Sequence, residues 1–546
     1  MKYLLYLSLL VFASLRVQAQ DEPPAGEIED AQIIIEKDKP LTLPKASRIY
    51  LKSQLRPVSQ DTVSLSYNLS RPQVSLATTP FQPVIKTYQV AGEETDNWNY
   101  FKGGFGNYLS PLLQGYGGWD INEQTSAGAY FYHESFATGP VRKEESAYAN
   151  TLVGLTGRLS QETMSLAPVI SFENESFYYY GRADGDSAEI TDRVNLNHFY
   201  LAVPIDLSPS DDWLFSFKPS FQAVGMGSGG STFNQDIGVA LEGTGTYQLS
   251  DQWSAFTRLN LTNWQYTSGF SSTRTVFDIN PGVRFSTDQF SIKAGALVTV
   301  GKDDSTNAVN VYPDVAIDFM ATDQLSIFVD AAGGLYSTNI NDLRLQNRYL
   351  DDSLTLLNQN NQIKLTAGVN YALRSDLSLE PFVGYSFSIY QPLFYHSVTD
   401  SSRFRVAYAS DGLGTTSFGA TVRWINNRSS LLGRMIIYSY QVDLFDEAWY
   451  LPTTELQVSY SQQLSKKFTV QSDLTVLQGI KAPSPTDGSI VELPTILDLS
   501  LEGTYSFNKN WSGFLRMNNV LGTKYERYLN YPTRGFTIKA GVIYRF

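Results

Sequence analysis

The sequence predicts an all-β chain that forms a transmembrane antiparallel up-and-down β-barrel, and three observations support this fold class. An apolar N-terminal segment has the form of an export signal, long strands with one apolar and one polar face follow, and the chain ends on a strand that finishes at Phe546. We expect about 22 strands, an even number between 16 and 24, after a short extended N-terminal segment.

The composition excludes several other classes of protein. The 546 residues carry a formal net charge of −13 and include no cysteine. An acidic chain argues against nucleic acid as a partner, because phosphate binding needs clustered Lys and Arg. Without cysteine there is no disulfide framework, no thiolate metal site and no lipid-anchored N-terminal cysteine. The 34 Tyr, 31 Phe and 8 Trp suit positions that are apolar at one end and wet at the other.

The first residues form a signal peptide. Lys2 supplies the positive start, residues 3–15 are apolar apart from two serines, and Val17-Gln18-Ala19 fits the small-residue cleavage rule, so we expect cleavage after Ala19. No later segment has the roughly 18 apolar residues of a membrane-spanning helix. Membrane insertion would therefore need a closed barrel, because lipid offers no partner for free backbone groups.

The chain divides into a signal peptide (1–19), an extended leader (20–97) and an outer-membrane barrel (98–546). Six prolines interrupt the leader between residues 40 and 83, and proline removes donors and favours extended backbone. A barrel of about 22 strands has a lumen too wide for its own side chains to fill. The long loops and residues 20–97 are the candidates to obstruct it, and we expect part of residues 39–97 to lie inside or across the periplasmic mouth of the barrel.

Strands of the barrel region alternate between two faces. In residues 497–507, Leu499 and Leu501 share one face, whereas Ser500 and Glu502 share the other. A soluble sandwich alternates as well. The charges within the polar face favour a wet lumen with the apolar face towards lipid; they include Arg258, Lys293, Asp330, Glu380, Asp473, Asp498 and Arg516.

The connections between strands are asymmetric. Ten are short polar turns, within residues 121–125, 159–163, 207–213, 249–253, 286–290, 321–325, 374–377, 425–429, 464–468 and 507–511. Longer polar connections alternate with them, at 175–193, 301–307, 336–361 and 481–493. Short turns at one rim and long loops at the other are typical of outer-membrane barrels. A β-propeller has a similar period, but its blades hold four short strands instead of two long ones.

The last strand ends in Lys539-x-Gly541-x-x-Tyr544-x-Phe546. This pattern resembles the C-terminal signal of outer-membrane barrels, which implies the barrel-assembly machinery as a partner during biogenesis. An ordinary edge strand ending in Phe is the alternative.

Residues 511–546 resemble the last two strands of TonB-dependent receptors. The matching positions are Asn519 and Leu521, Lys524 and Tyr525, and Pro532 and Gly535. The resemblance implies a receptor- or transporter-like barrel in outer-membrane lipid.

The N-terminus departs from that family, because about 78 residues precede the barrel where the family carries a folded plug. In this respect the chain resembles plugless, uncharacterised barrel proteins of Bacteroidetes. The run Ile33-Ile34-Ile35 follows an acidic stretch and is similar to a TonB box, which pairs as a strand with its partner. A short strand that caps its own barrel is the alternative.

Catalytic and cofactor motifs are absent from the sequence, and we expect no enzyme activity, no cofactor and no metal. His133, His198 and His396 show no zinc-site spacing. His133 and Ser135 share one strand face, which an outer-membrane lipase would need, but a polar strand end explains them better. An acidic loop at 184–192 suits solvent better than calcium. Residues 177–180 could stack on sugars or siderophores, but we expect them to form an aromatic belt at the membrane surface.

Two function classes follow. The first is a receptor-like barrel that binds or passes a solute through its lumen, with TonB as a candidate partner. The second is a non-transporting barrel that scaffolds a surface lipoprotein or an envelope assembly complex.

Overall fold

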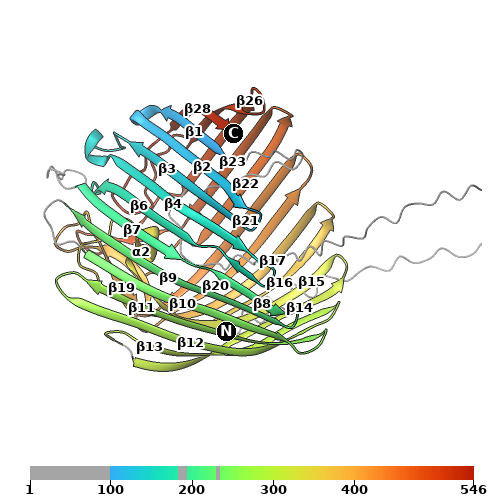
Figure 1. Ribbon diagram of the computed structural model, residues 1–546. Coiled ribbons are helices and arrows are strands. Elements are labelled where there is room, and N and C mark those ends of the chain that lie inside the picture. The colour runs from blue at the N-terminus through green and yellow to red at the C-terminus, as the bar shows by residue number, and fades with distance from the viewer. Residues whose placement is uncertain (1–98, 183–192, 229–233, 306) are drawn as a thin grey trace, which may run out of the picture. The chain divides into compact units, whose positions relative to one another are not determined.

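A computed structural model describes residues 99–182, 193–228, 234–305 and 307–546. It shows a closed antiparallel barrel (Figure 1). Its strands are β1 (Tyr100–Gly106), β2 (Ser110–Asn122), β3 (Thr125–Phe136), β4 (Tyr148–Ser160), β5 (Met164–Leu166), β6 (Val169–Tyr178), β7 (Arg193–Ala202), β8 (Ile205–Ser210), β9 (Trp213–Ser228), β10 (Asn234–Gln248), β11 (Trp253–Thr267), β12 (Ser271–Ser286), β13 (Phe290–Lys302), β14 (Asn307–Thr322), β15 (Leu325–Ser337), β16 (Asn358–Arg374), β17 (Leu377–Ile389), β20 (Leu413–Ile425), β21 (Ser429–Val442), β22 (Thr454–Ser465), β23 (Phe468–Gln478), β26 (Ile496–Ser506), β27 (Trp511–Asn518) and β28 (Thr537–Arg545).

The remaining elements lie in the long loops or next to them. They are the 3-10 helices η1 (Asn107–Leu109) and η2 (Lys143–Ser146), the helix α2 (Ile340–Gln346), the hairpin β18 (Gln391–His396)–β19 (Phe404–Ala409) and the hairpin β24 (Lys481–Pro483)–β25 (Ile490–Glu492). Among the helices of the described residues, none is long and apolar enough to cross a membrane.

The barrel has 22 strands, as the sequence predicted. Of its 24 labelled segments, β5 with β6 and β7 with β8 each form one interrupted strand, since β4 pairs with both β5 and β6, and β9 pairs with both β7 and β8. Pro168 and Pro204 lie at the interruptions, where a residue without an N–H cannot complete the ladder. Pairing of β1 with β28 closes the barrel.

The ten predicted short turns all connect neighbouring strands at one rim, which we call the short-turn rim. Local hydrogen bonds shape these turns: the Asn426 side chain accepts from the Arg428 and Ser429 amides at 2.8 Å, and Asn508 accepts from the Asn510 and Trp511 amides at 2.9 Å. The opposite end, the long-loop rim, carries every longer connection between the described strands.

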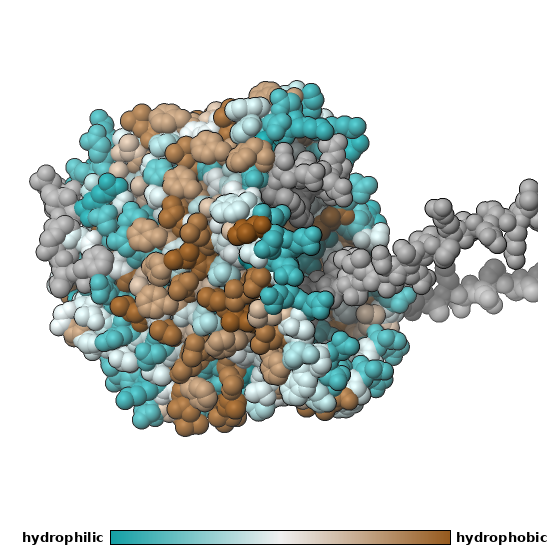
Figure 2. All heavy atoms as spheres, viewed as in Figure 1, coloured by the Kyte–Doolittle hydropathy of each residue, from teal (hydrophilic) through white to brown (hydrophobic). Residues whose placement is uncertain are grey.

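The two faces of the wall confirm the predicted alternation. Apolar side chains such as Phe172, Leu259 and Ile437 are exposed on the outside, and Figure 2 shows an apolar band around the visible face of the barrel. Charged side chains point inward and pair there, as Lys293 does with Asp314 at 2.6 Å. An apolar outside and an ion-paired inside suit a wall between lipid and a wet lumen.

Candidate functional site: a cap of long loops in the barrel mouth

Five long connections fold together at the long-loop rim, and we call them the cap. They are residues 338–357 with α2, 390–412 with β18 and β19, 443–453, 479–495 with β24 and β25, and 519–536. Residues of all five belong to one buried apolar cluster. The cap is the candidate functional site, because it lies where a solute from that side would meet the barrel.

Contacts with neighbouring segments stabilise the helix α2. Seven residues are too few for a stable isolated helix. The Asn339 side chain accepts from the Asp342 amide at 2.9 Å and caps the first turn. Ile340 and Leu343 are buried one turn apart, and the Ile340 amide donates to Asp236 of β10 at 3.0 Å. Tertiary contacts thus fix the helix against the barrel wall.

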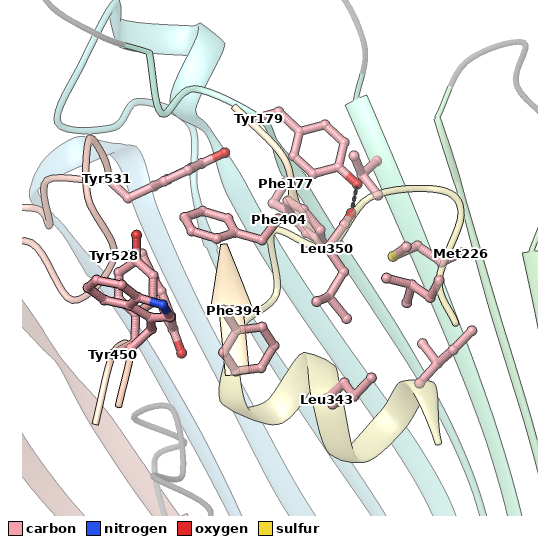
Figure 3. Packing of buried hydrophobic residues seen from close by; sticks show 14 of the residues in the cluster. Phe177, Tyr179, Met226, Leu343, Leu350, Phe394, Phe404, Tyr450, Tyr528 and Tyr531 are labelled. Atoms are coloured by element: carbon pink, nitrogen blue, oxygen red, sulfur yellow. Dashed lines mark hydrogen bonds between the residues drawn. The ribbon is translucent and has the colours of Figure 1, made fainter. Parts of the chain in front are cut away.

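The apolar core of the cap spans the mouth. Its wall residues include Phe177 of β6, Met226 of β9 and Leu477 of β23. Since β9 and β23 are the seventh and nineteenth of the 22 strands, they lie on opposite sides of the barrel. Phe394, Phe404, Tyr450, Tyr528 and Tyr531 belong to the same core, and Figure 3 shows them beside Phe177 and Leu350. The loops therefore bridge the lumen with a continuous apolar core.

Buried ion pairs tie α2 and its loop to the wall. Arg344 donates to Glu173 at 2.5 Å and to Glu175 at 2.9 Å, both on β6, and Arg348 pairs with Glu175 at 2.9 Å. Nearby, Asp236 holds both the amide of Ile340 and Arg274 of β12, and the Asp236 and Arg274 side chains are 0% exposed. Such charges are stable in an interior only when they are paired.

A second ionic group joins two loops of the cap. Arg405 of β19 donates to Asp351 at 3.0 Å, and Arg403 pairs with Asp352 and, at 3.7 Å, with Asp351. The Ser397 hydroxyl also donates to Asp351 at 2.9 Å. The 338–357 loop and the β18–β19 hairpin are thereby held as one unit.

Tyrosine hydroxyls satisfy the irregular backbone of the cap. Tyr179 donates to the Leu350 carbonyl at 2.5 Å (Figure 3), and Tyr408 donates to the Thr355 carbonyl at 3.0 Å. Tyr528 donates to the Gln346 carbonyl, and Tyr531 donates to the Ser402 carbonyl. Leu350 and Ser402 are buried outside regular structure, where a carbonyl needs such a donor, whereas Thr355 is exposed. Each of these contacts joins a loop to another loop or to a wall strand's end.

Burial keeps these hydroxyls in the donating form. Burial raises the pKa of Tyr528, and it raises the pKa of Tyr531 well above the ordinary value. A phenol of ordinary pKa is already protonated in the physiological range, and burial moves the pKa of these two further above it. The hydroxyls can therefore keep donating to the loop carbonyls that hold the cap together.

The receptor-like C-terminal positions lie around the 519–536 loop. Asn519, at φ 46°, donates to the carbonyls of Thr523 at 2.6 Å and Arg534 at 3.0 Å, which holds the two ends of the loop together. Tyr525 donates to Asp498 at 2.5 Å, and the Pro532 carbonyl accepts from Tyr180 at 3.2 Å. Gly535 is buried, whereas Leu521 and Lys524 are exposed.

The positions of the predicted assembly signal separate by face. Tyr544 stacks on Phe546 with ring centroids 5.6 Å apart, and Phe546 is exposed at the short-turn rim. Lys539 points inward, is fully buried and pairs with Glu134. Gly541 lies against the carbonyl of Gly103 across the β1–β28 seam.

One aromatic prediction was wrong. Residues 177–180 do not form an aromatic belt at the membrane surface, because Phe177 and Tyr179 point inward and belong to the cap core. The loops 390–412 and 443–453 were not predicted at all. Their aromatic residues at unpatterned positions, such as Trp449 and Tyr450, were the available signal.

The other sequence candidates have simple placements. His133 lies on the outside of β3, with Nδ1 2.8 Å from Thr151 Oγ1 and Nε2 3.2 Å from Ser135 Oγ. Ala19, Ile33, Ile34 and Ile35 and the acidic loop 184–192 lie outside the described residues. Within the part of the chain that the structure describes, no group of three or more His, Asp or Glu side chains is arranged to hold a metal ion.

No protein-family model and no curated protein matches the chain. Solved structures do match. The FrpB iron transporter from Neisseria meningitidis is 9% identical, with a TM-score of 0.65 over 83% of this chain and 82% of that one. The ferric-catecholate import receptor Fiu from E. coli is 10% identical, with a TM-score of 0.63 over 83% and 82%.

The ferric yersiniabactin uptake receptor FyuA from Yersinia pestis is 12% identical, with a TM-score of 0.58 over 82% of this chain and 80% of that one. Identities this low establish a shared fold and nothing more. The chain therefore has the fold of the outer-membrane receptor barrels.

Proposed function

We propose that this chain is an outer-membrane barrel of the receptor or transporter type, which binds or passes a solute through its lumen and keeps its long-loop mouth closed at rest. The observation that carries the proposal is the cap core, which runs from wall to wall inside a 22-strand barrel. A barrel of that size has a lumen wider than its own side chains fill, so a built-in closure implies that passage is controlled.

Further support comes from the wall and from the neighbours in fold. The apolar outer belt suits outer-membrane lipid. The solved neighbours are described as an iron transporter and as import or uptake receptors for ferric compounds. The barrel-assembly machinery would insert the chain after cleavage at Ala19. Strand pairing by Ile33–Ile35 would supply any coupling to TonB.

Conductance of the purified full-length barrel in a planar bilayer tests the proposal. We expect a small or absent conductance for the native chain and a large, steady conductance when a short Gly-Ser linker replaces residues 391–409. A matched control shortens only the exposed tip of the β24–β25 hairpin, residues 485–489, and leaves the conductance low. A wide open pore in the native chain would contradict a closing role for the cap.

The same measurement without residues 20–97 separates the two candidate obstructions. If the leader also fills the lumen, only the barrel that lacks both the leader and the hairpin conducts fully. If the cap alone closes the barrel, removal of the hairpin is sufficient.

The many contacts that hold the cap in the barrel mouth favour a second candidate function, a non-transporting scaffold. Buried ion pairs and buried tyrosine hydrogen bonds, within the cap and between the cap and the wall, suit a permanent closure. The scaffold would hold a surface lipoprotein or an envelope assembly complex. Recovery of a stoichiometric partner with the detergent-solubilised barrel, together with no gain of solute uptake in cells that carry the hairpin deletion, would favour it.

A further inference from the structure

The β1–β28 seam is the one junction of the barrel where no connection between the two strands fixes the register. It pairs seven residues on each side, from Tyr100 with Arg545 to Gly106 with Lys539. Side chains in a strand repeat every two residues, so a slip by two residues keeps every side chain on its correct face. The alternation of apolar and polar residues therefore cannot select the native register at this seam.

Two inward lysines cross the seam in opposite directions. Lys102 of β1 reaches over β28 and β27 to Glu502 of β26, with 2.6 Å between Nζ and Oε1. Lys539 of β28 reaches over β1 and β2 to Glu134 of β3. The two lysine side chains are 8% and 0% exposed, respectively. Each lysine thus depends on a carboxylate that belongs to the other side of the seam.

Further contacts hold both pairs in place. Lys102 lies over the ring of Phe514 at 4.2 Å, and Lys539 lies over the ring of Phe136 at 4.1 Å. The carboxylates are also engaged, since Arg516 donates to Glu502 at 2.6 Å and Tyr132 donates to Glu134 at 3.0 Å. A two-residue slip moves each lysine by about 6.6 Å along its strand. Both pairs would then break together and leave buried charges without partners, which is strongly unfavourable.

Glycines at the seam also favour the native register over a slip by two residues. A Cβ on Gly541 would lie 2.0 Å from the Gly103 carbonyl oxygen, and a Cβ on Gly106 would lie 2.1 Å from the Ile538 carbonyl oxygen. After a slip by two residues, Lys539 or Ile543 would take the place of Gly541 at this close approach. The native register is the one that puts glycine there.

The seam also positions one loop of the cap. Asn107, just after β1, donates to the Phe536 carbonyl at 2.9 Å and accepts from the Ile538 amide at 3.0 Å. From the 519–536 loop, Arg534 donates to the Ser146 carbonyl at 2.9 Å and lies 4.4 Å from the Phe136 ring centroid. A shifted seam would misplace the loop that carries Tyr528 and Tyr531.

We propose that Lys102 and Lys539 are register-determining residues, which lock β1 to β28 in one register and thereby allow the cap to assemble. The chain contains no cysteine, so engineered cysteine pairs report the register without background. Phe105 and Ala540 are native partners across the seam. The pair Phe105→Cys/Ala540→Cys reports the native register, and Phe105→Cys with either Ile538→Cys or Val542→Cys reports a slip by two residues.

In the otherwise unchanged full-length barrel, we expect the native pair to form a disulfide and the slipped pairs to stay reduced. With Lys102→Met and Lys539→Met together, the ratio of slipped to native crosslinks should rise at least about tenfold. Lys293→Met is the matched control, because the Lys293–Asp314 pair links neighbouring strands far from the seam. It should leave the ratio unchanged. An unchanged ratio in the double methionine variant would overturn the proposal.

A charge swap keeps the test decisive if the methionine variant yields no folded barrel. Lys539→Glu alone should lower native crosslinking, and Lys539→Glu with Glu134→Lys should restore it, together with protease protection of the 519–536 loop. If the swapped pair does not restore native crosslinking, the lysine–glutamate pair does not select the register and the proposal fails.

Discussion

The wall of the barrel is held by backbone pairing between strands that mostly follow one another in the chain, whereas the cap is held by side chains from loops that lie far apart in the sequence. Trp253 of β11 pairs with Phe285 of β12, its neighbour across one hairpin. Tyr179 and Leu350 are 171 residues apart, and Tyr528 and Gln346 are 182 residues apart. A repeated pattern specifies the wall, and individual partners specify the cap.

This difference predicts different responses to mutation. Away from the β1–β28 seam and from the contacts with the cap, an outward-facing wall position tolerates any side chain that suits its face, because the ladder hydrogen bonds are made by the backbone. A cap position depends on one particular partner, and loss of that partner leaves a buried group unsatisfied. The variants below test this contrast in order of expected effect.

Loss of Arg344 should have the largest effect. Arg344→Met removes the cation that Glu173 and Glu175 of β6 share and leaves Glu175 with Arg348 alone, and breaking a buried ion pair costs about 3–5 kcal/mol. We expect the 338–357 loop to become sensitive to protease while the barrel keeps its heat-modifiable migration on gels. Arg374→Met, at the exposed short-turn rim, is the control and should change neither property. Loss of the folded barrel itself would show that cap and wall are one cooperative unit.

A charge on the outer face should disturb the wall. Leu499→Arg places a cation towards lipid and should cost about 2–4 kcal/mol of insertion stability if the position lies near the bilayer midplane. Ser500→Arg points into the lumen beside Asp473 and should be tolerated. Equilibrium unfolding of the barrel in lipid vesicles measures both variants. The reverse ranking would mean that the assigned faces are exchanged.

Removal of one tyrosine hydroxyl should destabilise the cap by less than the loss of Arg344 does. Tyr531→Phe leaves the Ser402 carbonyl without this donor, and an unsatisfied buried group costs about 1–3 kcal/mol. Hydrogen exchange of residues 400–404 should accelerate, while exchange of the barrel strands stays unchanged. Tyr505→Phe, on the exposed outer face, is the matched variant and should leave both rates as they are. Equal exchange in the two variants would argue against stabilisation of the cap by the Tyr531 hydroxyl.

The smallest expected effect is a dependence on pH through His396. Burial lowers the pKa of this histidine, which lies in the β18–β19 hairpin with Nδ1 2.6 Å from the Ser401 carbonyl. Because the unfolded state accepts the proton more readily, the contribution of neutral His396 to cap stability is complete above the ordinary pKa of about 6.5. It is lost as the pH falls through the lowered pKa.

Limited proteolysis of the hairpin at pH 7.5 and at pH 5 measures this effect. We expect faster cleavage at pH 5, and His396→Gln should reduce the difference between the two conditions. If the difference persists unchanged in that variant, another titrating group causes it instead.

The sequence allowed the wall to be predicted because its information is local. Two-residue alternation identified the outward faces of β23 and β26, and polar turn residues such as those at Asn426 and Asn508 identified the ten turns and hence the number of strands. The cap could not be predicted in the same way. Phe177 and Tyr179 have the spacing of any strand end, and their partners Tyr349 and Leu350 are identified only by the fold.

The C-terminal strand could be predicted from the sequence in part, less fully than the wall but better than the cap. Its apolar face and its aromatic end are visible in the sequence, and the family resemblance identified Lys539 as one position of a signal. The inward direction of Lys539 follows from alternation alone. Its partner Glu134 does not, because the two residues meet only after the first and last strands have paired.

The tyrosine-bonded backbone of the cap has a consequence for proteases and antibodies that approach the long-loop rim. A protease must draw several residues of extended chain into its cleft, and backbone held by buried side chains is a poor substrate. The turn between β18 and β19 differs, since Val398 is 90% exposed. We therefore expect protease cleavage, antibody epitopes and natural insertions to concentrate at such hairpin tips. The chain between the tips should resist proteases and bind no antibodies.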